Sequence, residues 1–207
     1  YSVFEDFNHQ SYLTQYYTKR VIKHWVEEFK SDGFRWDLTK GFTQNCNAGD
    51  DGCTNAYQQD RVDILKSYAD YSWSLDPDHY VIFEHLGGSS EEQQWANYRL
   101  NEGKGIMMWG KVNNPYYQLL MGYGSDSNFG GIGHESRGFQ GKRLLGYFES
   151  HDEERIMYKA LQYGNNWDGY NIQELNIALS RMSAIGAMSL TIPALSLIHI
   201  SEPTRPL

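Results

Sequence analysis

Short apolar runs alternate with longer amphipathic stretches along the chain, and this alternation constrains the fold more than any other feature. The runs have the length and the β-branched and aromatic content of strands, and the stretches have the spacing of helices. The predicted strands are residues 33–38, 80–86, 105–110 and 143–149. The predicted helices are residues 11–31, 57–73, 90–102 and 172–190. Strand followed by helix, repeated, predicts an α/β fold with a parallel sheet and crossover helices.

Two of these helices carry readable apolar faces. In residues 11–31 apolar side chains recur every fourth position and predict the apolar stripe of an amphipathic helix: Tyr17, Val21, Trp25 and Phe29. In residues 57–73 the spacing predicts four inward positions: Val62, Leu65, Ala69 and Trp73. Residues 41–55 are predicted to be a long polar loop, and a Gly-, Asn- and Tyr-rich stretch extends to about residue 141.

Charge and hydropathy argue against two partners, nucleic acid and a membrane. The 207 residues hold 18 Lys and Arg against 26 Asp and Glu, a net charge of −8. No basic cluster is long enough to follow a phosphate backbone, so nucleic acid is not an expected partner. No apolar run approaches the roughly 18 residues that span a bilayer, so no membrane span is expected. No organic cofactor is expected either.

The two cysteines, Cys46 and Cys53, lie in the polar, turn-rich segment NCNAGDDGCT. A disulfide between them is favoured over two free thiols, because the segment offers no core in which to bury them. A disulfide would indicate an oxidising compartment. Two cysteines without a nearby histidine fit a zinc site poorly.

Charged residues close three of the predicted strands. The pairs are Arg35 with Asp37, Glu84 with His85, and His151 with Asp152. Arg35 and Asp37 are two positions apart, which puts them on one face of a strand. In α/β barrels the active site gathers at the carboxyl ends of the strands. These side chains are therefore candidates for a common site.

Three carboxylates at strand ends suit glycoside hydrolysis, which needs a pair flanking the scissile bond. Glu84 follows the apolar run YVIF, whose burial would raise its pKa and suit it as an acid. Asp37 beside Arg35 would stay ionised and could attack, while Asp152 beside His151 could hold sugar hydroxyls. Taken singly, a carboxylate at a strand end is most often a solvated loop residue, and a lone pair such as Arg35 with Asp37 is most often a structural ion pair.

The segments GFRWD, FEHLG and FESHDEE resemble three signature segments of the α-amylase family, glycoside hydrolase family 13. The resemblance covers about residues 1–193 and implies a partial catalytic domain. The implied fold is a fragment of a TIM (β/α)8 barrel that contains about strands 4 to 7 and their helices. The implied function is that of a retaining glycosidase that cleaves α-1,4-glucosidic bonds in starch or related α-glucans.

The resemblance also implies a role for each matching residue. Asp37 resembles the nucleophile, Glu84 the general acid/base and Asp152 the transition-state stabiliser. The substrate-binding candidates are Arg35, Lys40 and His151. The expected partner is an α-glucan polysaccharide or oligosaccharide, and the parent protein is expected to be monomeric and secreted, extracellular or periplasmic.

The sequence departs from the family pattern in three places. Gly41 stands where many members have a histidine that gives a backbone oxygen to calcium, so a calcium ion would rest on the Gly41 carbonyl or on Asp50 and Asp51. The first signature segment is not found. Residues 194–207 resemble translated sequencing-adapter sequence and are predicted to be a non-native tail. Four strands cannot close a barrel, so the chain alone is expected to be insoluble or inactive.

Three alternatives stay open at this point. An α-glucan transglycosylase or branching enzyme would use the same three carboxylates and differ in its acceptor. A non-catalytic sugar-binding member of the same fold would not need them. An unrelated α/β structural domain would show the three ordered motifs only by coincidence.

Overall fold

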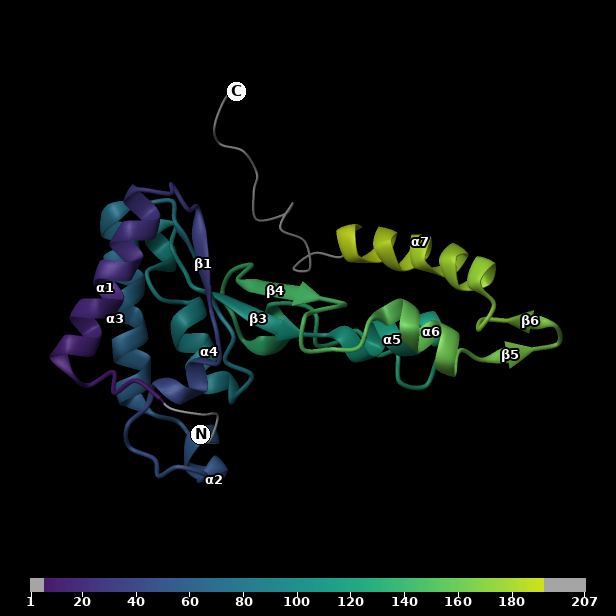
Figure 1. Cartoon of the computed structure of the whole chain (residues 1–207), viewed down its shortest axis with the longest axis horizontal. Helices are drawn as coiled ribbons and strands as arrows, with labels where there is room; N and C mark the ends of the chain where they lie inside the picture. Colours follow the sequence, from purple (N-terminus) through teal and green to yellow (C-terminus); the bar gives the residue numbers. More distant parts are fainter. Residues whose placement is uncertain (1–5, 192–207) are drawn as a thin grey trace. The chain divides into compact units, whose positions relative to one another are not determined.

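The computed structural model describes residues 6–191 and divides them into two compact units. The first unit runs to Trp109 and includes Arg137–Arg143, and the second contains Gly110–Ser136 and the chain from Leu144 onward. The predicted tail at residues 194–207 lies outside the described residues. Figure 1 shows the elements in chain order. The bounds up to the third strand are α1 Tyr12–Glu27, β1 Gly33–Trp36, η1 Thr39–Phe42, α2 Asp51–Asn55, α3 Gln59–Leu75, β2 Tyr80–Phe83, α4 Ser89–Ala96, η2 Leu100–Glu102 and β3 Met107–Lys111. The later ones are α5 Asn113–Met121, η3 Glu135–Arg137, β4 Leu144–Tyr147, α6 Ile156–Tyr163, β5 Asn166–Trp167, β6 Tyr170–Asn171 and α7 Leu175–Thr191.

A four-stranded parallel sheet, in the order β1-β2-β3-β4, confirms the α/β fold class. The register pairs Gly33 with Tyr80 and Trp36 with Phe83, so β1 and β2 end side by side. Gly33 is required where the two strands begin, because a Cβ there would lie 2.6 Å from the Cβ of Tyr80. All four strands fall where short apolar runs predicted them.

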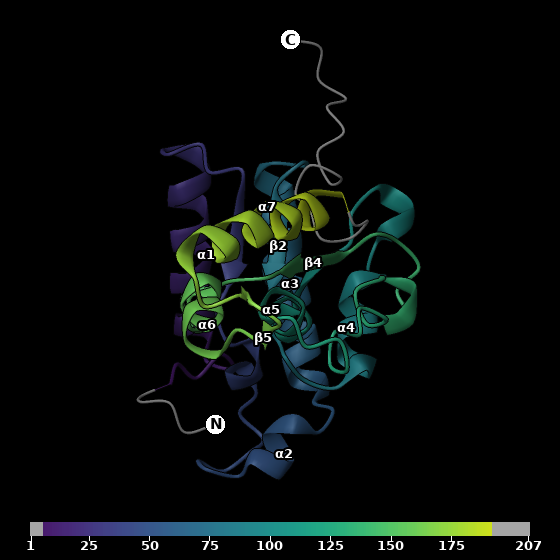
Figure 2. The ribbon, with the colours of Figure 1, turned by 90° about the vertical axis from the view of Figure 1, so that its right-hand side faces the viewer.

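The core of the first unit lies between the sheet and its helices. Figures 1 and 2 show α3 between α1 and α4, and α3 packs against both neighbours. All four inward positions predicted for this helix are buried: Val62, Leu65, Ala69 and Trp73. Trp95 of α4 packs edge-on against Phe83 of β2 with ring centroids 5.4 Å apart. The helical periodicity therefore identified the packed face of α3 correctly.

The apolar stripe predicted for α1 is not its buried face. Tyr17, Val21, Trp25 and Phe29 are exposed, and the buried side chains are Ile22 and Val26. These two positions, four apart, lie on the neighbouring face of the helix, and α1 packs on α3. Both faces of α1 carry apolar side chains, so spacing alone did not identify the packed one.

The end of α1 also differs from the prediction of a helix that continues to residue 31. Lys30 has a φ of 55°, in the left-handed region. The Ser31 N–H donates to the Trp25 carbonyl at 3.2 Å, which folds the chain back over the last turn of the helix. This turn ends the helix before Asp32 and Gly33.

The second unit has a core of its own, built on α5, α6 and α7 with the β5–β6 hairpin. Its fully buried side chains come from all three helices and the hairpin: Tyr116, Leu120, Ile156, Ala160, Ile172 and Ala178. The sequence predicted α7 but neither α5 nor α6. Asn, Gly and Pro around α5 masked its helical spacing, because these residues are typical of turns.

The segment predicted as a long loop at residues 41–55 contains two short helical turns. η1 begins at Thr39, separated from β1 by Asp37 and Leu38, and α2 holds Cys53. The Asp50 side chain accepts a hydrogen bond from the Cys53 N–H at 2.9 Å and so caps α2. An Asp followed by a short polar run is also typical of a turn, so the sequence did not reveal this helix.

Candidate active site

The carboxyl ends of β1 and β2 bring Asp37 and Glu84 together in the first unit. Each is the first residue after its strand, and the strands pair residue by residue up to Trp36 and Phe83. The Glu84 N–H donates to the Trp36 carbonyl at 3.0 Å, which continues the ladder by one bond. A parallel register without offset therefore accounts for the meeting of two carboxylates that are far apart in sequence.

Arg35 connects the two carboxylates. Its guanidinium is ion-paired with Asp37, and its Nη2 lies 2.8 Å from Glu84 Oε1. The guanidinium carbon also lies 5.3 Å from the ring centroid of Trp109, over the ring face. Arg35 and Asp37 thus share one face of the strand, as their spacing predicted.

The two carboxylates differ sharply in exposure. The side chain of Asp37 is 74% exposed, and that of Glu84 is 7% exposed. Burial raises the pKa of Glu84 above its usual value, and a hydrogen bond with Asp37 and the charge of Asp37 add to this effect. The Leu38 N–H and the charge of Arg35 act in the opposite direction without cancelling it. Glu84 thus keeps its proton to a higher pH than an ordinary glutamate does.

Trp36 faces away from this pair. Its ring stacks on Tyr68 of α3 with an interplanar angle of 9° and centroids 5.4 Å apart. Strand alternation accounts for this, because successive side chains point to opposite faces. Trp36 therefore belongs to the core that supports the site.

The turn after β1 is held against Glu84 by backbone bonds. The Thr39 N–H donates to the Glu84 carbonyl at 2.8 Å, and the Leu38 N–H donates to Glu84 Oε2 at 3.1 Å. Leu38 has a φ of 43°, a left-handed conformation that costs a non-glycine residue energy. The two bonds to Glu84 offset that cost. They fix the turn from which Lys40 extends.

Lys40, the predicted sugar-contacting lysine, lies beside α2. Its Nζ donates to Asn55 Oδ1 at 2.8 Å. Its carbonyl accepts a hydrogen bond from Arg61 Nη1 at 2.8 Å, which ties the Lys40 backbone to α3. The side chain and the main chain of Lys40 are therefore both positioned from outside the turn.

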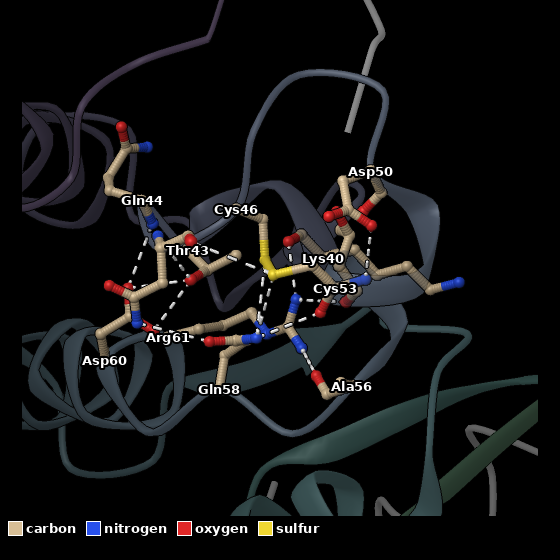
Figure 3. The surroundings of a disulfide bond; sticks show 12 residues. Lys40, Thr43, Gln44, Cys46, Asp50, Cys53, Ala56, Gln58, Asp60 and Arg61 are labelled. Atoms are coloured by element: carbon tan, nitrogen blue, oxygen red, sulfur yellow. Dashed lines mark hydrogen bonds between the residues drawn. A yellow bond between two sulfur atoms is a disulfide. The ribbon is translucent and has the colours of Figure 1, made fainter.

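A disulfide joins Cys46 and Cys53 next to this turn, and Figure 3 shows its surroundings. Gln58 Nε2 lies 3.5 Å from each sulfur and donates to the Cys53 carbonyl at 3.1 Å. The disulfide closes the segment that leads from the turn into α3. It stabilises the side of the site on which Lys40 lies.

The residues named for calcium do not form a side-chain site. Among residues 6–191, no group of three or more His, Cys, Asp or Glu side chains is arranged to hold a metal ion. Asp50 is used as the helix cap, and Asp51 lies in the first turn of α2. Calcium at Asp50, Asp51 or the Gly41 carbonyl stays a prediction.

His151 and Asp152 belong to the second unit, in the turn after β4. Their side chains are 68% and 57% exposed, and His151 Nε2 lies 3.4 Å from Asp152 Oδ2. The Asp152 N–H donates to Ser150 Oγ at 3.3 Å. Both residues therefore follow a strand, as predicted, and are open to solvent.

Sequence reasoning missed the buried charges behind the first-unit pair. Arg61, Glu91 and Glu92 are all at most 1% exposed. One signal was available for Arg61, which immediately precedes the core residue Val62 in DRVDILK. The other partners are 30 or more positions away along the chain, beyond any local pattern.

Comparison with protein-family models finds no match to this chain, and no curated protein matches it. In the described part of the chain, the helices are too short or too polar to span a bilayer.

Proposed function

We propose that this chain carries part of the active site of a retaining glycosidase that acts on α-glucans such as starch. The observation that carries the proposal is the group of Arg35, Asp37 and Glu84 at the ends of two adjacent parallel strands. The resemblance of the surrounding segments to glycoside hydrolase family 13 supports the α-glucan substrate and a (β/α)8 barrel as the parent fold.

The difference between the two carboxylates supports a division of labour. An acid catalyst must keep its proton near neutral pH, and the burial that raises the pKa of Glu84 favours this. A nucleophile must be ionised and reachable, and Asp37 is exposed and paired with a guanidinium. Retaining glycosidases keep the two carboxyl groups roughly 5 Å apart, whereas inverting ones leave room for a water. The shared contact of both carboxylates with the Arg35 guanidinium supports the closer, retaining arrangement.

The reaction then proceeds in two balanced steps. Asp37 attacks the anomeric carbon while Glu84 gives its proton to the glycosidic oxygen, so that one glucan leaves with a new hydroxyl and the other is bound as an ester. Glu84, now ionised, takes a proton from water, and the resulting hydroxide displaces Asp37 from the sugar. Arg35, ion-paired with Asp37, orients the carboxylate for attack and faces it again when it is released from the sugar.

The remaining assignments come from the resemblance. Lys40 is proposed to contact the sugar next to the cleavage point. Asp152 and His151 are proposed to stabilise the sugar cation and bind its hydroxyls. Replacement of water by a sugar hydroxyl in the second step would give a transglycosylase, which makes products longer than its substrate.

The test uses the full-length product of the gene that encodes this chain. A fluorinated α-glucosyl fluoride, which loses fluoride and leaves its sugar on the nucleophile, is added and the labelled peptide is identified by mass spectrometry. We expect the sugar on the peptide that contains Asp37. Reducing-sugar release from soluble starch is measured in parallel and should fall by several orders of magnitude in Asp37→Asn.

The matched control is Asp32→Asn, which makes the same chemical change just before the other end of β1. This variant should be labelled and should release sugar as the wild type does. A folded wild type that is neither labelled nor releases sugar would overturn the proposal. Equal activity of Asp37→Asn and Asp32→Asn would remove Asp37 from its role.

A further inference from the structure

Arg61 is a fully buried guanidinium whose nitrogens all donate hydrogen bonds. Its exposed fraction is 0%. Nη1 donates to the carbonyls of Lys40 and Thr54 at 2.8 and 2.9 Å, and Nη2 donates to the carbonyl of Ala56 at 3.0 Å. Nε and Nη2 face the carboxylate of Glu91, with a shortest distance of 2.8 Å. One side chain thus joins the Lys40 turn, the disulfide-closed segment and α4, as Figure 3 shows for the first two.

Glu91 accepts from the opposite side as well. The Gln58 N–H donates to its Oε1 at 2.9 Å, and His85 Nε2 lies 2.7 Å from its Oε2. Burial raises the pKa of Glu91, but hydrogen bonds from His85, Arg61 and Gln58 outweigh burial and lower the pKa overall. Glu91 is therefore an ionised carboxylate at the centre of a satisfied network.

His85 continues the network toward Glu84. Burial lowers the pKa of His85, so the ring is neutral at neutral pH and gives its one N–H, on Nε2, to Glu91. Its Nδ1, which carries no proton in this tautomer, lies 3.2 Å from the Thr39 hydroxyl, and that hydroxyl gives its single hydrogen either to Nδ1 or to the Glu84 carbonyl 3.1 Å away. A continuous chain of contacts therefore runs from Arg61 to the backbone of Glu84.

Stability alone is a weak explanation for such a pair. Removing two charges from water costs several kcal/mol per ion, and well-packed apolar residues often stabilise a core as well or better. Fixed geometry is what a bidentate arginine–carboxylate pair supplies and apolar packing does not. The pair holds the two strand-end segments that carry the proposed acid and the proposed sugar-binding lysine.

We propose that Arg61 and Glu91 are positioning residues, which hold the Leu38–Lys40 turn and the His85–Thr39 contact so that Glu84 and Lys40 keep their places in the site. The inference rests on the proposed function for the roles of Glu84 and Lys40. Neither Arg61 nor Glu91 touches substrate in this scheme.

The decisive measurement is the titration of Glu84 by NMR, in the full-length gene product labelled with ¹³C at glutamate carboxyls. The Leu38 N–H lowers the pKa of Glu84 through its bond to Oε2. Arg61→Lys and Glu91→Gln should free the Leu38–Lys40 turn, weaken this bond and raise the pKa of Glu84 by at least a few tenths of a unit. This readout does not depend on activity, so it can succeed even where the proposed function fails.

Arg143→Lys is the matched control, because Arg143 also donates to backbone carbonyls, those of Gly103 and Lys104, within the same unit. It should leave the pKa of Glu84 unchanged. Amide hydrogen exchange adds a second criterion, since Arg61→Lys and Glu91→Gln should speed exchange at Thr39 while the amides of α3 stay protected. Faster exchange throughout the unit, with an unchanged Glu84 pKa, would mean that the pair only stabilises the fold and would overturn the proposal.

Thr39→Val and Thr39→Ser keep the proposal testable if the buried pair cannot be altered without unfolding. The valine removes only the hydroxyl that joins His85 to the Glu84 carbonyl, and the serine restores it. We expect Thr39→Val to raise the pKa of Glu84 and Thr39→Ser to return it to the wild-type value. Identical titrations in both variants would contradict the proposal.

The activity arm separates this inference from the proposed function. In the full-length gene product, Arg61→Lys should raise KM for a long maltooligosaccharide about as much as Lys40→Ala does. The variants could alter the Glu84 titration while the wild type shows no glucan hydrolysis. That result would support the positioning network and reject the glycosidase. If the wild type hydrolyses glucan but Arg61→Lys changes neither the Glu84 titration nor KM, the glycosidase proposal stands and the positioning role of Arg61 is rejected.

Discussion

Two adjacent glutamates on α4, Glu91 and Glu92, show how partners decide the charge of a buried carboxyl. Both are 1% exposed. Glu91 faces hydrogen-bond donors from three residues, and its pKa is lowered overall. Glu92 has Arg137 Nη2 at 3.4 Å, too weak an attraction to offset its burial, and its pKa rises to about 7. Charge is thus set here by the number and geometry of donors.

The raised pKa of Glu92 predicts that stability falls as pH rises. The folded state binds the proton more tightly than the unfolded state, where the ordinary value is 4.5. The stabilisation is complete below that value and is lost as pH rises through about 7. The full loss amounts to roughly 3–4 kcal/mol. Glu92→Gln should remove this loss, so that the variant is more stable than the wild type at pH near 8.

Urea unfolding at a pH near 5.5 and near 8 measures this difference. Glu27→Gln on α1, which changes an exposed carboxylate, should follow the wild type at both values. Other titrating groups affect both proteins equally, so the difference between Glu92→Gln and wild type reports Glu92 alone. A wild type that is no less stable than Glu92→Gln at the higher pH would contradict the prediction.

At the scale of elements, the disulfide-closed segment is a small ring attached to α3. Its two cysteines are separated by 7 positions. Closing a ring of this size removes conformational entropy from the unfolded chain. Cys46→Ser with Cys53→Ser should lower the free energy of unfolding by about 2–3 kcal/mol.

Urea denaturation with and without dithiothreitol tests this estimate. The reductant should lower the free energy of unfolding of the wild type to that of the double variant. It should leave the free energy of unfolding of the double variant unchanged. Equal midpoints for all four samples would show that the ring does not constrain the unfolded chain.

The exposed aromatic face of α1 predicts self-association. Trp25 and Phe29 are 46% and 61% exposed, and their ring centroids lie 4.7 Å apart, which makes a continuous apolar surface. Such surfaces favour association in water. Trp25→Gln with Phe29→Gln should shift the chain toward a monomer in size-exclusion chromatography with light scattering at rising concentration.

Ile22→Gln is the contrasting variant, because Ile22 is only 3% exposed on the face that packs inward. It should lower the melting temperature without reducing association. If Trp25→Gln with Phe29→Gln lowers the melting temperature as much as Ile22→Gln does, the aromatic face of α1 is packed in solution.

For the molecule as a whole, the sequence predicted the positions of the four strands well, and it predicted that Arg35, Asp37 and Glu84 lie at strand ends. Strand alternation placed Arg35 with Asp37, and a parallel register without offset brought Glu84 beside them. Both follow from local patterns and from the rule that parallel strands end at one edge. The roles of these residues, and the barrel to which their segments point, stay predictions.

What the sequence could not predict depends on contacts between distant residues. Arg61 and Glu91 are 30 positions apart, and each is acceptable in a buried place only because the other is there. The face of α1 that is buried is the one that packs on α3, and the apolar content of α1 alone did not identify it. The two helices missed in the second unit are stabilised by a shared core that no single segment reveals.

The disulfide-closed ring also has a consequence for the order of folding. Contacts within about 10 residues form in tens of nanoseconds, whereas the bonds of Arg61 to Lys40 and Glu91 close spans of 21 and 30 residues. Disulfide formation itself takes seconds to hours, so the two cysteines are joined at the outset in a chain that refolds with its disulfide intact. The carbonyls of Thr54 and Ala56 then lie close to their final places before the guanidinium arrives. For such a chain the closed ring precedes the long-range ion pair, so the search for two of the acceptors that Arg61 requires is shortened.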